Sequence, residues 1–327
     1  MGFADIIGQS EPINILKKEL INQRIQHAYL FTGREGTGKK TLALEFTKSL
    51  MCENEIADNC GYCKYCRKIA HKNHPDVRLI EAADNSKIKI EQMRNLQKEI
   101  AYRPYESDKK IYIIDKAGMM TDEAANSLLK TLEEPPDYAI IILLAEELSR
   151  VLPTIISRCQ HINIGIIPQT LIKDYLIKKG ENEDRAELLS TIANGSIGRA
   201  NKIAEDDNFL NKRKDIMNFL SSLPEINISE IIEKAAFFKQ LITEGYPVLN
   251  LLSTWYRDII MYKSDSKDFL ANRDFINEIR KQIEIYTINE LFAILELIQK
   301  HRFYLEKNVR SDLILQVLLL KIRAKKV

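Results

Sequence analysis

The first half of the chain alternates between short apolar runs and longer segments that have apolar residues at helical spacing. Continuous apolar runs of this kind are typical of strands that are buried on both faces of a parallel sheet. The expected strands are Ala28–Phe31, Val77–Ile80, Ile111–Ile114, Ala139–Ala145 and His161–Ile164. Because helical segments lie between them, the pattern predicts a three-layer α/β domain with a five-stranded parallel sheet that ends near residue 165.

The pattern changes after Pro168, where we expect helices and no strand. The shorter helices are expected over Thr170–Lys179, Asp184–Asn194 and Gly198–Glu205. Longer helices follow, and their apolar stripes are interpreted as packing surfaces. The predicted parts of the chain are an α/β domain (1–165), a small helical domain (166–207) and an all-α domain (208–327).

A glycine-rich loop follows the first predicted strand and leads into a helix. The stretch HAYLFTGREGTGKKT matches the phosphate-binding sequence G-x-x-x-x-G-K. The position after this sequence should be Ser or Thr to bind Mg²⁺, but it is Lys40, and a threonine comes one place late. The candidate phosphate-binding residues are Gly33, Gly36, Gly38, Lys39, Lys40 and Thr41. The sequence leaves open whether this loop binds ATP or ADP, or is a turn that binds nothing.

The third predicted strand ends where a Walker B motif belongs. Its last residue is followed by Asp115, a candidate metal ligand, and then by Lys116. ATP hydrolysis on this scaffold requires a second acid next to the aspartate, which polarises the attacking water. A lysine is cationic at neutral pH and cannot act as that base. We therefore expect no hydrolysis at this site, with Asp115 as a remnant of the motif.

Four of the five cysteines lie close together in the sequence. Cys60, Cys63 and Cys66 form two overlapping C-x-x-C steps, and Cys52 lies a short way upstream. Four thiolates with this spacing can close a tetrahedral structural Zn²⁺ site. The sequence therefore predicts a zinc module over residues 52–66, against the alternative of four unconnected thiols.

Composition narrows the class of protein further. The chain has 327 residues, with 48 basic and 46 acidic side chains, so its net charge of +2 creates no general attraction for nucleic acid. The first residues lack the features of a signal peptide, and the longest apolar run, Tyr138–Ala145, is far shorter than the roughly 20 residues of a membrane span. We expect a cytoplasmic protein without membrane contact, in which clustered cysteines bind metal.

Two further stretches have sequences that distinguish one protein family from others. They are ANSLLKTLEEPP over Ala125–Pro136 and LPTIISRC over Leu152–Cys159. Together with the glycine-rich loop and the cysteine insert after its helix, they make the chain resemble the AAA+ clamp-loader family, and within it the delta-prime subunits of bacterial DNA polymerase III. The resemblance covers the whole chain. It implies an AAA+ domain with a zinc insert, a helical lid domain and an all-α C-terminal collar.

Within this family the alternative is an active gamma/tau-like ATPase. Such a subunit should carry Thr or Ser after the loop lysine, Asp-Glu in Walker B, Thr at the first sensor and Arg at the second. At these positions the chain has Lys40, Lys116, Glu146 followed by Glu147, and Gly198 with Arg199 displaced by one. These departures favour a delta-prime subunit without intrinsic ATPase activity.

The sequence Ser157-Arg158-Cys159 follows the short helix after Pro153. Its place between the fourth and fifth strands is where an arginine finger would project toward the γ-phosphate of a neighbouring subunit. The resemblance implies that Arg158 acts in trans. The chain would then be a stator in a circular pentamer with three gamma/tau subunits and one delta subunit, which loads the sliding clamp onto primed DNA.

Two other functions stay open at this point. One is an autonomous ATPase or helicase-like remodeller that uses its own P-loop. The other is a zinc-dependent nucleic-acid binder. This function is favoured by the basic residues of the cysteine insert, Lys64, Arg67 and Lys68. These residues are instead interpreted as balancing the negative charge of the thiolates.

Overall fold

The computed structural model describes residues 2–54, 57–82, 87–306 and 311–324. Residues 55 and 56 of the predicted zinc module lie outside this set. The chain divides into two compact units, the first with residues 1–171 and 195–198, the second with residues 172–194 and 199–327. The further division of the helical part into a lid and a collar stays a prediction.

The first unit is built on a five-stranded parallel sheet with the order β2-β3-β4-β1-β5. The strands are β1 (Ala28–Thr32), β2 (Val77–Ile80), β3 (Lys110–Ile114), β4 (Ala139–Ala145) and β5 (Gln160–Asn163). Each lies within one residue of its predicted range. The three central strands β1, β3 and β4 are buried along their whole length. These strands do not alternate between apolar and polar residues because apolar layers cover both faces of the sheet.

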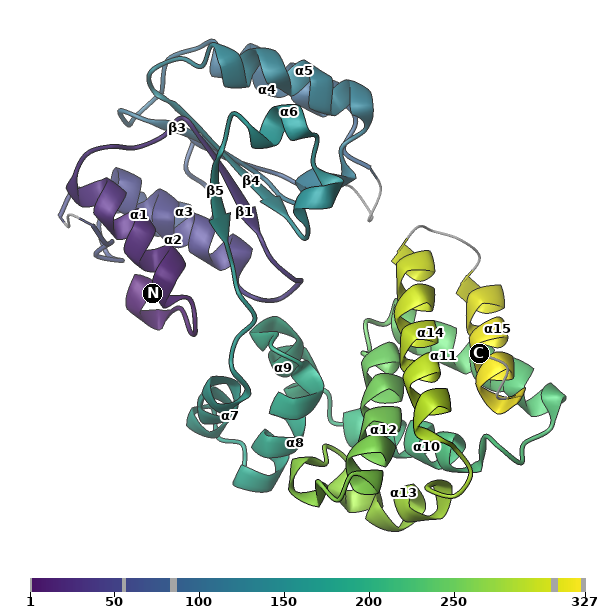
Figure 1. The fold of residues 1–327 in the computed structure, drawn as a ribbon. Coiled ribbons are helices and arrows are strands. Elements are labelled where there is room, and N and C mark those ends of the chain that lie inside the picture. The colour runs from purple at the N-terminus through teal and green to yellow at the C-terminus, as the bar shows by residue number, and fades with distance from the viewer. Residues whose placement is uncertain (1, 55–56, 83–86, 307–310, 325–327) are drawn as a thin grey trace. The chain divides into compact units, whose positions relative to one another are not determined.

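Helices cover both faces of this sheet (Figure 1). Tyr29 and Phe31 of β1 point to the layer that contains α1, α2 and α3, whereas Leu30 points to the layer of α4, α5 and α6. The helices are α1 (Ser10–Ile21), α2 (Lys39–Met51), α3 (Lys64–Ala70), α4 (Ile90–Ile100), α5 (Asp122–Glu133) and α6 (Pro153–Ile156), with 3-10 turns η1 (Phe3–Asp5), η3 (Ala117–Met119) and η4 (Leu148–Arg150). The predicted three-layer α/β architecture is confirmed.

The described residues of the second unit form helices joined by loops, with no strand. Its helices are α8 (Glu183–Ala193), α10 (Phe209–Ser222), α11 (Ile228–Thr243), α12 (Val248–Lys263), α13 (Ile276–Gln282), α14 (Ile288–Glu306) and α15 (Ser311–Ala324), with η5 (Lys267–Phe269) and η6 (Arg273–Phe275). Helices α7 (Gln169–Lys178) and α9 (Ile197–Ala204) begin in the first unit and continue in the second.

The C-terminal helices pack in pairs, α11 against α15 and α12 against α14. Trp255 of α12 is fully buried, and its indole N–H donates to Gln282 at 2.9 Å. The apolar stripes of these helices are therefore packing surfaces, as predicted. Among the described residues, no helix is long and apolar enough to cross a membrane.

Candidate functional site

The glycine-rich loop connects β1 to α2 at the carboxyl edge of the sheet. Gly33 passes so close to β5 that a Cβ atom there would lie 2.3 Å from the carbonyl oxygen of Ile164. Gly38 caps α2 with a φ of 101°, a left-handed conformation that glycine adopts without strain. Because α2 begins at Lys39, the backbone N–H groups of its first turn are available to a phosphate.

Lys39 is folded back onto this loop. Its Nζ donates to the carbonyl oxygens of Gly33 at 2.6 Å and Arg34 at 2.9 Å. Burial lowers the pKa of Lys39, although the nearby carboxylates of Glu146 and Asp115 act in the opposite direction. The ammonium of the predicted phosphate-binding lysine therefore lies against the loop, near the acidic residues that follow β3 and β4.

Lys40 occupies the position at which the motif requires a hydroxyl group. Its ammonium forms an ion pair with Glu81 and lies 3.6 Å from Oδ2 of Asp115. Thr41 is the next residue of α2, turned by about 100° around the helix axis. An ammonium cannot ligate a metal ion, so the donor set beside Asp115 does not fit Mg²⁺.

Asp115 directly follows β3, as the sequence predicts. Its Oδ1 accepts a hydrogen bond from the backbone N–H of Lys116 at 2.9 Å. Lys116 has a φ of 55°, in the left-handed region, and begins the turn η3. The structure thus brings Lys39, Lys40 and Asp115 together, with a lysine at the position of the catalytic acid.

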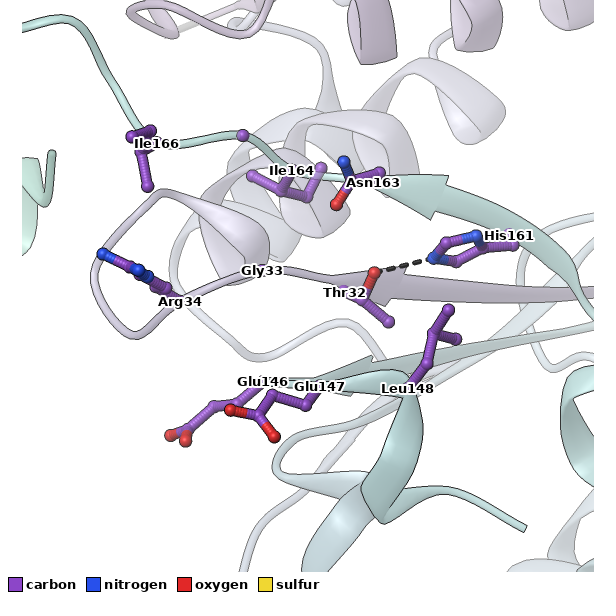
Figure 2. A pocket seen from close by; sticks show the side chains of 11 residues that line it. Thr32, Gly33, Arg34, Glu146, Glu147, Leu148, His161, Asn163, Ile164 and Ile166 are labelled. Carbon is purple, nitrogen blue, oxygen red and sulfur yellow. Dashed lines mark hydrogen bonds between the residues drawn. The ribbon is translucent and has the colours of Figure 1, made fainter. Parts of the chain in front are cut away.

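A cavity of about 560 Å³ lies beside the P-loop, at the carboxyl ends of β4, β1 and β5. Figure 2 shows Glu146 and Glu147 on the segment after β4, with Arg34 on the loop after β1. Thr32 of β1 and His161 of β5 also line this cavity, and the hydroxyl of Thr32 and Nε2 of His161 are 2.7 Å apart. Glu146 and Glu147 make the β4 side of the cavity acidic, which is unfavourable for another anionic group such as a γ-phosphate.

Gly198 lies directly against the P-loop. Its backbone N–H donates to the carbonyl oxygen of Gly36 at 2.9 Å. A Cβ atom at Gly198 would be 3.0 Å from the Cα atom of Gly36. Close approach of two backbones therefore explains why glycine fits this position, where the resemblance places a second-sensor arginine. Arg199, the displaced arginine, donates instead to the backbone carbonyl of Ala193 at 3.1 Å.

Arg158 lies after α6 and immediately before β5. Its guanidinium donates to the carbonyl oxygen of Thr154 at 2.9 Å and to Oε1 of Glu133 at 2.6 Å. The side chain is 35% exposed. Since β1 and β5 are parallel and Tyr29 pairs with Gln160, Arg158 lies at the amino edge of the sheet, opposite the P-loop. The structure does not bring Arg158 to the other candidate residues.

The four predicted cysteine ligands come together. The sulfur atoms of Cys52, Cys60, Cys63 and Cys66 all lie within 4.8 Å of one another. Tetrahedral thiolate coordination with metal–sulfur bonds of about 2.3 Å requires sulfur atoms about 3.8 Å apart, so the cluster fits a metal ion. The backbone N–H groups of Cys63 and Cys66 point to the sulfur three residues earlier, at 3.3 Å and 3.4 Å. Cys52 directly follows α2, which links the cluster to the P-loop helix.

The thiols of this cluster are electrostatically different. Desolvation raises the pKa of Cys60, but hydrogen bonds from the amides of Cys63 and Tyr62 outweigh it and lower the pKa to about 6. Burial raises the pKa of Cys66, so a bound metal ion must displace its proton. Cys159 is not part of the cluster, and burial raises its pKa to about 12.

The basic and histidine residues near the cluster have other partners. Lys64 forms an ion pair with Glu53 at 3.1 Å, and Lys68 with Glu106 at 2.6 Å. Nδ1 of His71 is 2.8 Å from the backbone carbonyl of Arg67. Two of the three basic side chains considered for nucleic acid are thus paired with carboxylates.

Three residues of these sites were not predicted from the sequence. Glu81 contacts Lys40, Glu133 contacts Arg158, and His161 contacts Thr32. The pairing of β1 with β5 could have indicated His161, because it places that residue opposite Leu30 and next to Thr32. Glu81 lies in an ordinary acidic context, and Glu133 belongs to the stretch ANSLLKTLEEPP, but neither sequence indicates which basic side chain the glutamate contacts.

Known proteins with similar sequences point to one family. Two family profiles match, "DNA polymerase III, delta subunit" over residues 8–167 and "DNA polymerase III, delta subunit, C terminal" over residues 207–324. The DNA polymerase III subunit delta' of Bacillus subtilis is 33% identical over 311 residues, which are 93% of each chain. The tau/gamma subunit of Haemophilus influenzae is 35% identical over 228 residues, 68% of this chain and 33% of that protein.

A solved structure gives the same picture of the fold. The gamma subunit-related protein of Thermotoga maritima superposes with a TM-score of 0.50 over 97% of this chain and 100% of that one, at 21% identity. At this identity the likeness shows the fold alone. The match to the B. subtilis protein spans nearly the whole of both sequences, and both family profiles agree with it. The chain therefore belongs to the delta-prime subunits of bacterial DNA polymerase III, within the AAA+ clamp-loader family.

Proposed function

We propose that this chain is a stator of the clamp loader: hydrolytically silent at its own P-loop, it supplies Arg158 to the ATP site of a neighbouring motor subunit. In that role the guanidinium stabilises the charge that develops on the transferred γ-phosphoryl group. The chain would act during loading of the sliding clamp onto primed DNA.

The position of Arg158 carries this proposal. The residue precedes β5 at the amino edge of the sheet, whereas the P-loop follows β1 at the carboxyl edge. The length of strand β5, roughly 13 Å, separates the two edges. The partly exposed guanidinium therefore cannot serve its own P-loop, and a phosphate in a second subunit is the substrate that it can reach.

The residues around the P-loop support the proposal that this chain does not hydrolyse ATP itself. Lys40 replaces the metal-binding hydroxyl and Lys116 replaces the catalytic acid. Glu146 adds a negative charge beside the loop at the position of the first sensor. The glycines and Lys39 retain the form of a phosphate cradle, so a nucleoside di- or triphosphate bound there would have a structural role.

We further propose that the partners are gamma/tau and delta subunits, joined through the C-terminal helices. The relatives are subunits of DNA polymerase III. Helices α11, α14 and α15 carry apolar side chains that are between 42% and 54% exposed within the isolated chain, which favours burial in an assembly. These side chains are Ile228, Ile232, Ile288, Phe292, Leu313 and Val317.

The metal at the cysteine cluster is proposed to be Zn²⁺. Four thiolates are a soft ligand set for which tetrahedral zinc is the usual partner. With four protein ligands the site has no open coordination position, so its role is to fix the segment after α2 rather than to catalyse.

The alternative is an active gamma/tau-like ATPase, because gamma and tau subunits also match 68% of the chain. That alternative predicts steady DNA-stimulated ATP hydrolysis by the isolated chain, which Lys39→Ala would abolish. The stator proposal predicts no turnover by the isolated chain above that of a buffer control.

The main test is ATP hydrolysis by the complete clamp loader reconstituted with Arg158→Ala. An arginine finger contributes a factor of about 10³ to 10⁵ at the site that it serves, so we expect hydrolysis at the adjacent motor site to be lost. Arg158→Lys keeps the charge but not the planar fork, and should also be defective. Gel filtration confirms that each complex assembles. An Arg158→Ala complex with unchanged ATPase activity would refute the proposal.

A further inference from the structure

The side chain of Lys40 lies where a P-loop protein places its divalent metal ion. In the motif, a Ser or Thr hydroxyl after the loop lysine binds the metal, and a Walker B aspartate lies on its other side. Here the Lys40 ammonium forms an ion pair with Glu81, and it is 3.6 Å from Oδ2 of Asp115. A cation thus lies next to the Walker B carboxylate, but it belongs to the chain itself.

This arrangement disfavours a second cation at the same place. A divalent ion beside Asp115 would be repelled by the ammonium, and it would find one hydroxyl ligand fewer than the motif supplies. Asp115 is also engaged on its other oxygen by the backbone N–H of Lys116. Magnesium keeps a strict octahedral shell of oxygen ligands, which a site with a lysine in place of the hydroxyl cannot complete.

Thr41 cannot restore the missing ligand. Helix α2 is already regular from Lys39, so consecutive side chains leave the axis about 100° apart. Lys40 points to Asp115, and Thr41 therefore points away from that direction. A shift of the loop by one residue would turn the side chain of Thr41 toward Asp115. The loop is fixed, however, by the packing of Gly33 on Ile164 and of Gly36 on Gly198.

We propose that Lys40 is a tethered cation that excludes divalent metal from this P-loop, so that the ligand the loop can take is a nucleoside di- or triphosphate without its metal ion. Phosphate charge is then met by Lys39, Lys40 and the backbone N–H groups at the start of α2. The inference rests on the proposal that this chain does not hydrolyse ATP at its own P-loop, and it gives a reason for that inactivity. It is independent of the role of Arg158.

The experiment uses Mn²⁺ as a paramagnetic probe on the full chain with its cysteine site loaded with zinc. Free Mn²⁺ is followed by electron paramagnetic resonance during titration, with ADP present and absent. Lys40→Thr restores the sequence G-K-T, and Lys18→Thr on the exposed side of α1 removes the same charge elsewhere. A double variant, Lys40→Thr with Asp115→Asn, tests the location of any site that is gained.

We expect the original chain and Lys18→Thr to bind no Mn²⁺ at the P-loop below millimolar concentrations. With ADP, Lys40→Thr should bind one Mn²⁺ per chain at least about tenfold more tightly, and the double variant should lose this gain. Mn²⁺ binding by the original chain as tight as that of Lys40→Thr would overturn the proposal, as would no gain in Lys40→Thr. Either result would leave the Arg158→Ala test untouched, whereas unchanged ATPase in that test would remove the stator role and leave metal exclusion standing.

Discussion

The cysteine cluster and the P-loop lie at opposite ends of helix α2, and they differ in how completely each follows its motif. At the end of the helix, all four cysteine sulfurs converge within 4.8 Å of one another. At its start, the loop has its glycines and Lys39, but Lys40 takes the place of the metal-binding hydroxyl. The cluster has a full ligand set, and the P-loop lacks one ligand.

This difference shows how much depends on a single side chain. Replacing a neutral ligand by a cation does not merely weaken a metal site, because the ammonium pairs with the carboxylate that the metal would have used. The loop can keep its form without its chemistry, since contacts to Ile164 and Gly198 hold it in place. The two ends of α2 should therefore respond differently to substitution.

The largest effect is expected at the cysteine cluster. Cys66 is fully buried, and Cys66→Ser should release the metal ion and lower the free energy of unfolding by about 3 to 5 kcal/mol, because metal binding contributes to folding. Metal content per chain and urea unfolding measure both effects. Cys159→Ser is the matched control, and it should retain the metal ion. A Cys66→Ser chain with full metal content and stability would show that the cluster is not a metal site.

The next effect measures how the backbone packing of the P-loop contributes to stability when no nucleotide is bound. Gly33→Ala places a methyl group against the backbone of Ile164 and should cost about 3 kcal/mol in unfolding free energy, with no nucleotide present. Gly38→Ala meets no atom within 4 Å, so only its left-handed φ opposes the change, at about 1 kcal/mol. Equal losses for the two variants would contradict a packing role for Gly33.

A smaller effect is expected where Glu133 holds Arg158. Exposed ion pairs contribute at most about 1 kcal/mol, so Glu133→Gln should reduce the rate at the one motor site that Arg158 serves by no more than about fivefold. The reduction should appear in kcat with KM for ATP unchanged, because Glu133 orients the guanidinium and does not contact the nucleotide. Glu134→Gln, one residue later, should have no effect. An equal loss in both variants would mean that Glu133 does not position Arg158.

A further expected effect is a pH dependence next to the cysteine cluster, which appears only at acidic pH. His74 is buried, its Nδ1 accepts the backbone N–H of Asp76 at 3.1 Å, and burial lowers its pKa although Glu106 and Asp76 oppose this. The unfolded chain therefore takes up the proton first as pH falls below about 6.5, and stability is lost by at most about 1.4 kcal/mol per pH unit.

Urea unfolding at pH 7.5 and 5.5 measures this loss, and His74→Gln should reduce it. His71→Gln, on the exposed side of the same segment, should keep the full pH dependence. An unchanged pH dependence in His74→Gln would show that His74 does not titrate in this range.

Much of the fold could be predicted because its signals are local in the sequence. The three central strands are continuous apolar runs, the two edge strands are short segments with apolar residues, and the cysteine spacing by itself indicates a shared ligand site. The absence of a hydroxyl at position 40 and of an acid at position 116 could also be read directly. These features need no knowledge of which strands are neighbours.

The contacts between distant segments could not be predicted in this way. Glu81 follows β2 and meets Lys40 because β2 pairs with β3, and Lys40 lies beside Asp115 at the end of β3. Glu133 meets Arg158 because α5 and α6 belong to the same layer. Gly198 was predicted as a departure from a sensor motif, but its packing on Gly36 depends on the return of residues 195–198 to the first unit. Such contacts are properties of the fold and not of a short stretch.

The most direct measurement compares Lys39→Ala and Arg158→Ala, each introduced into this chain within the complete clamp loader, by DNA-stimulated ATP hydrolysis at saturating ATP. We expect Arg158→Ala to lower hydrolysis by at least the share of one motor site, and Lys39→Ala to leave it within error of the unmodified complex. The reverse pattern, loss with Lys39→Ala and none with Arg158→Ala, would contradict it, because the chain would then be using its own P-loop.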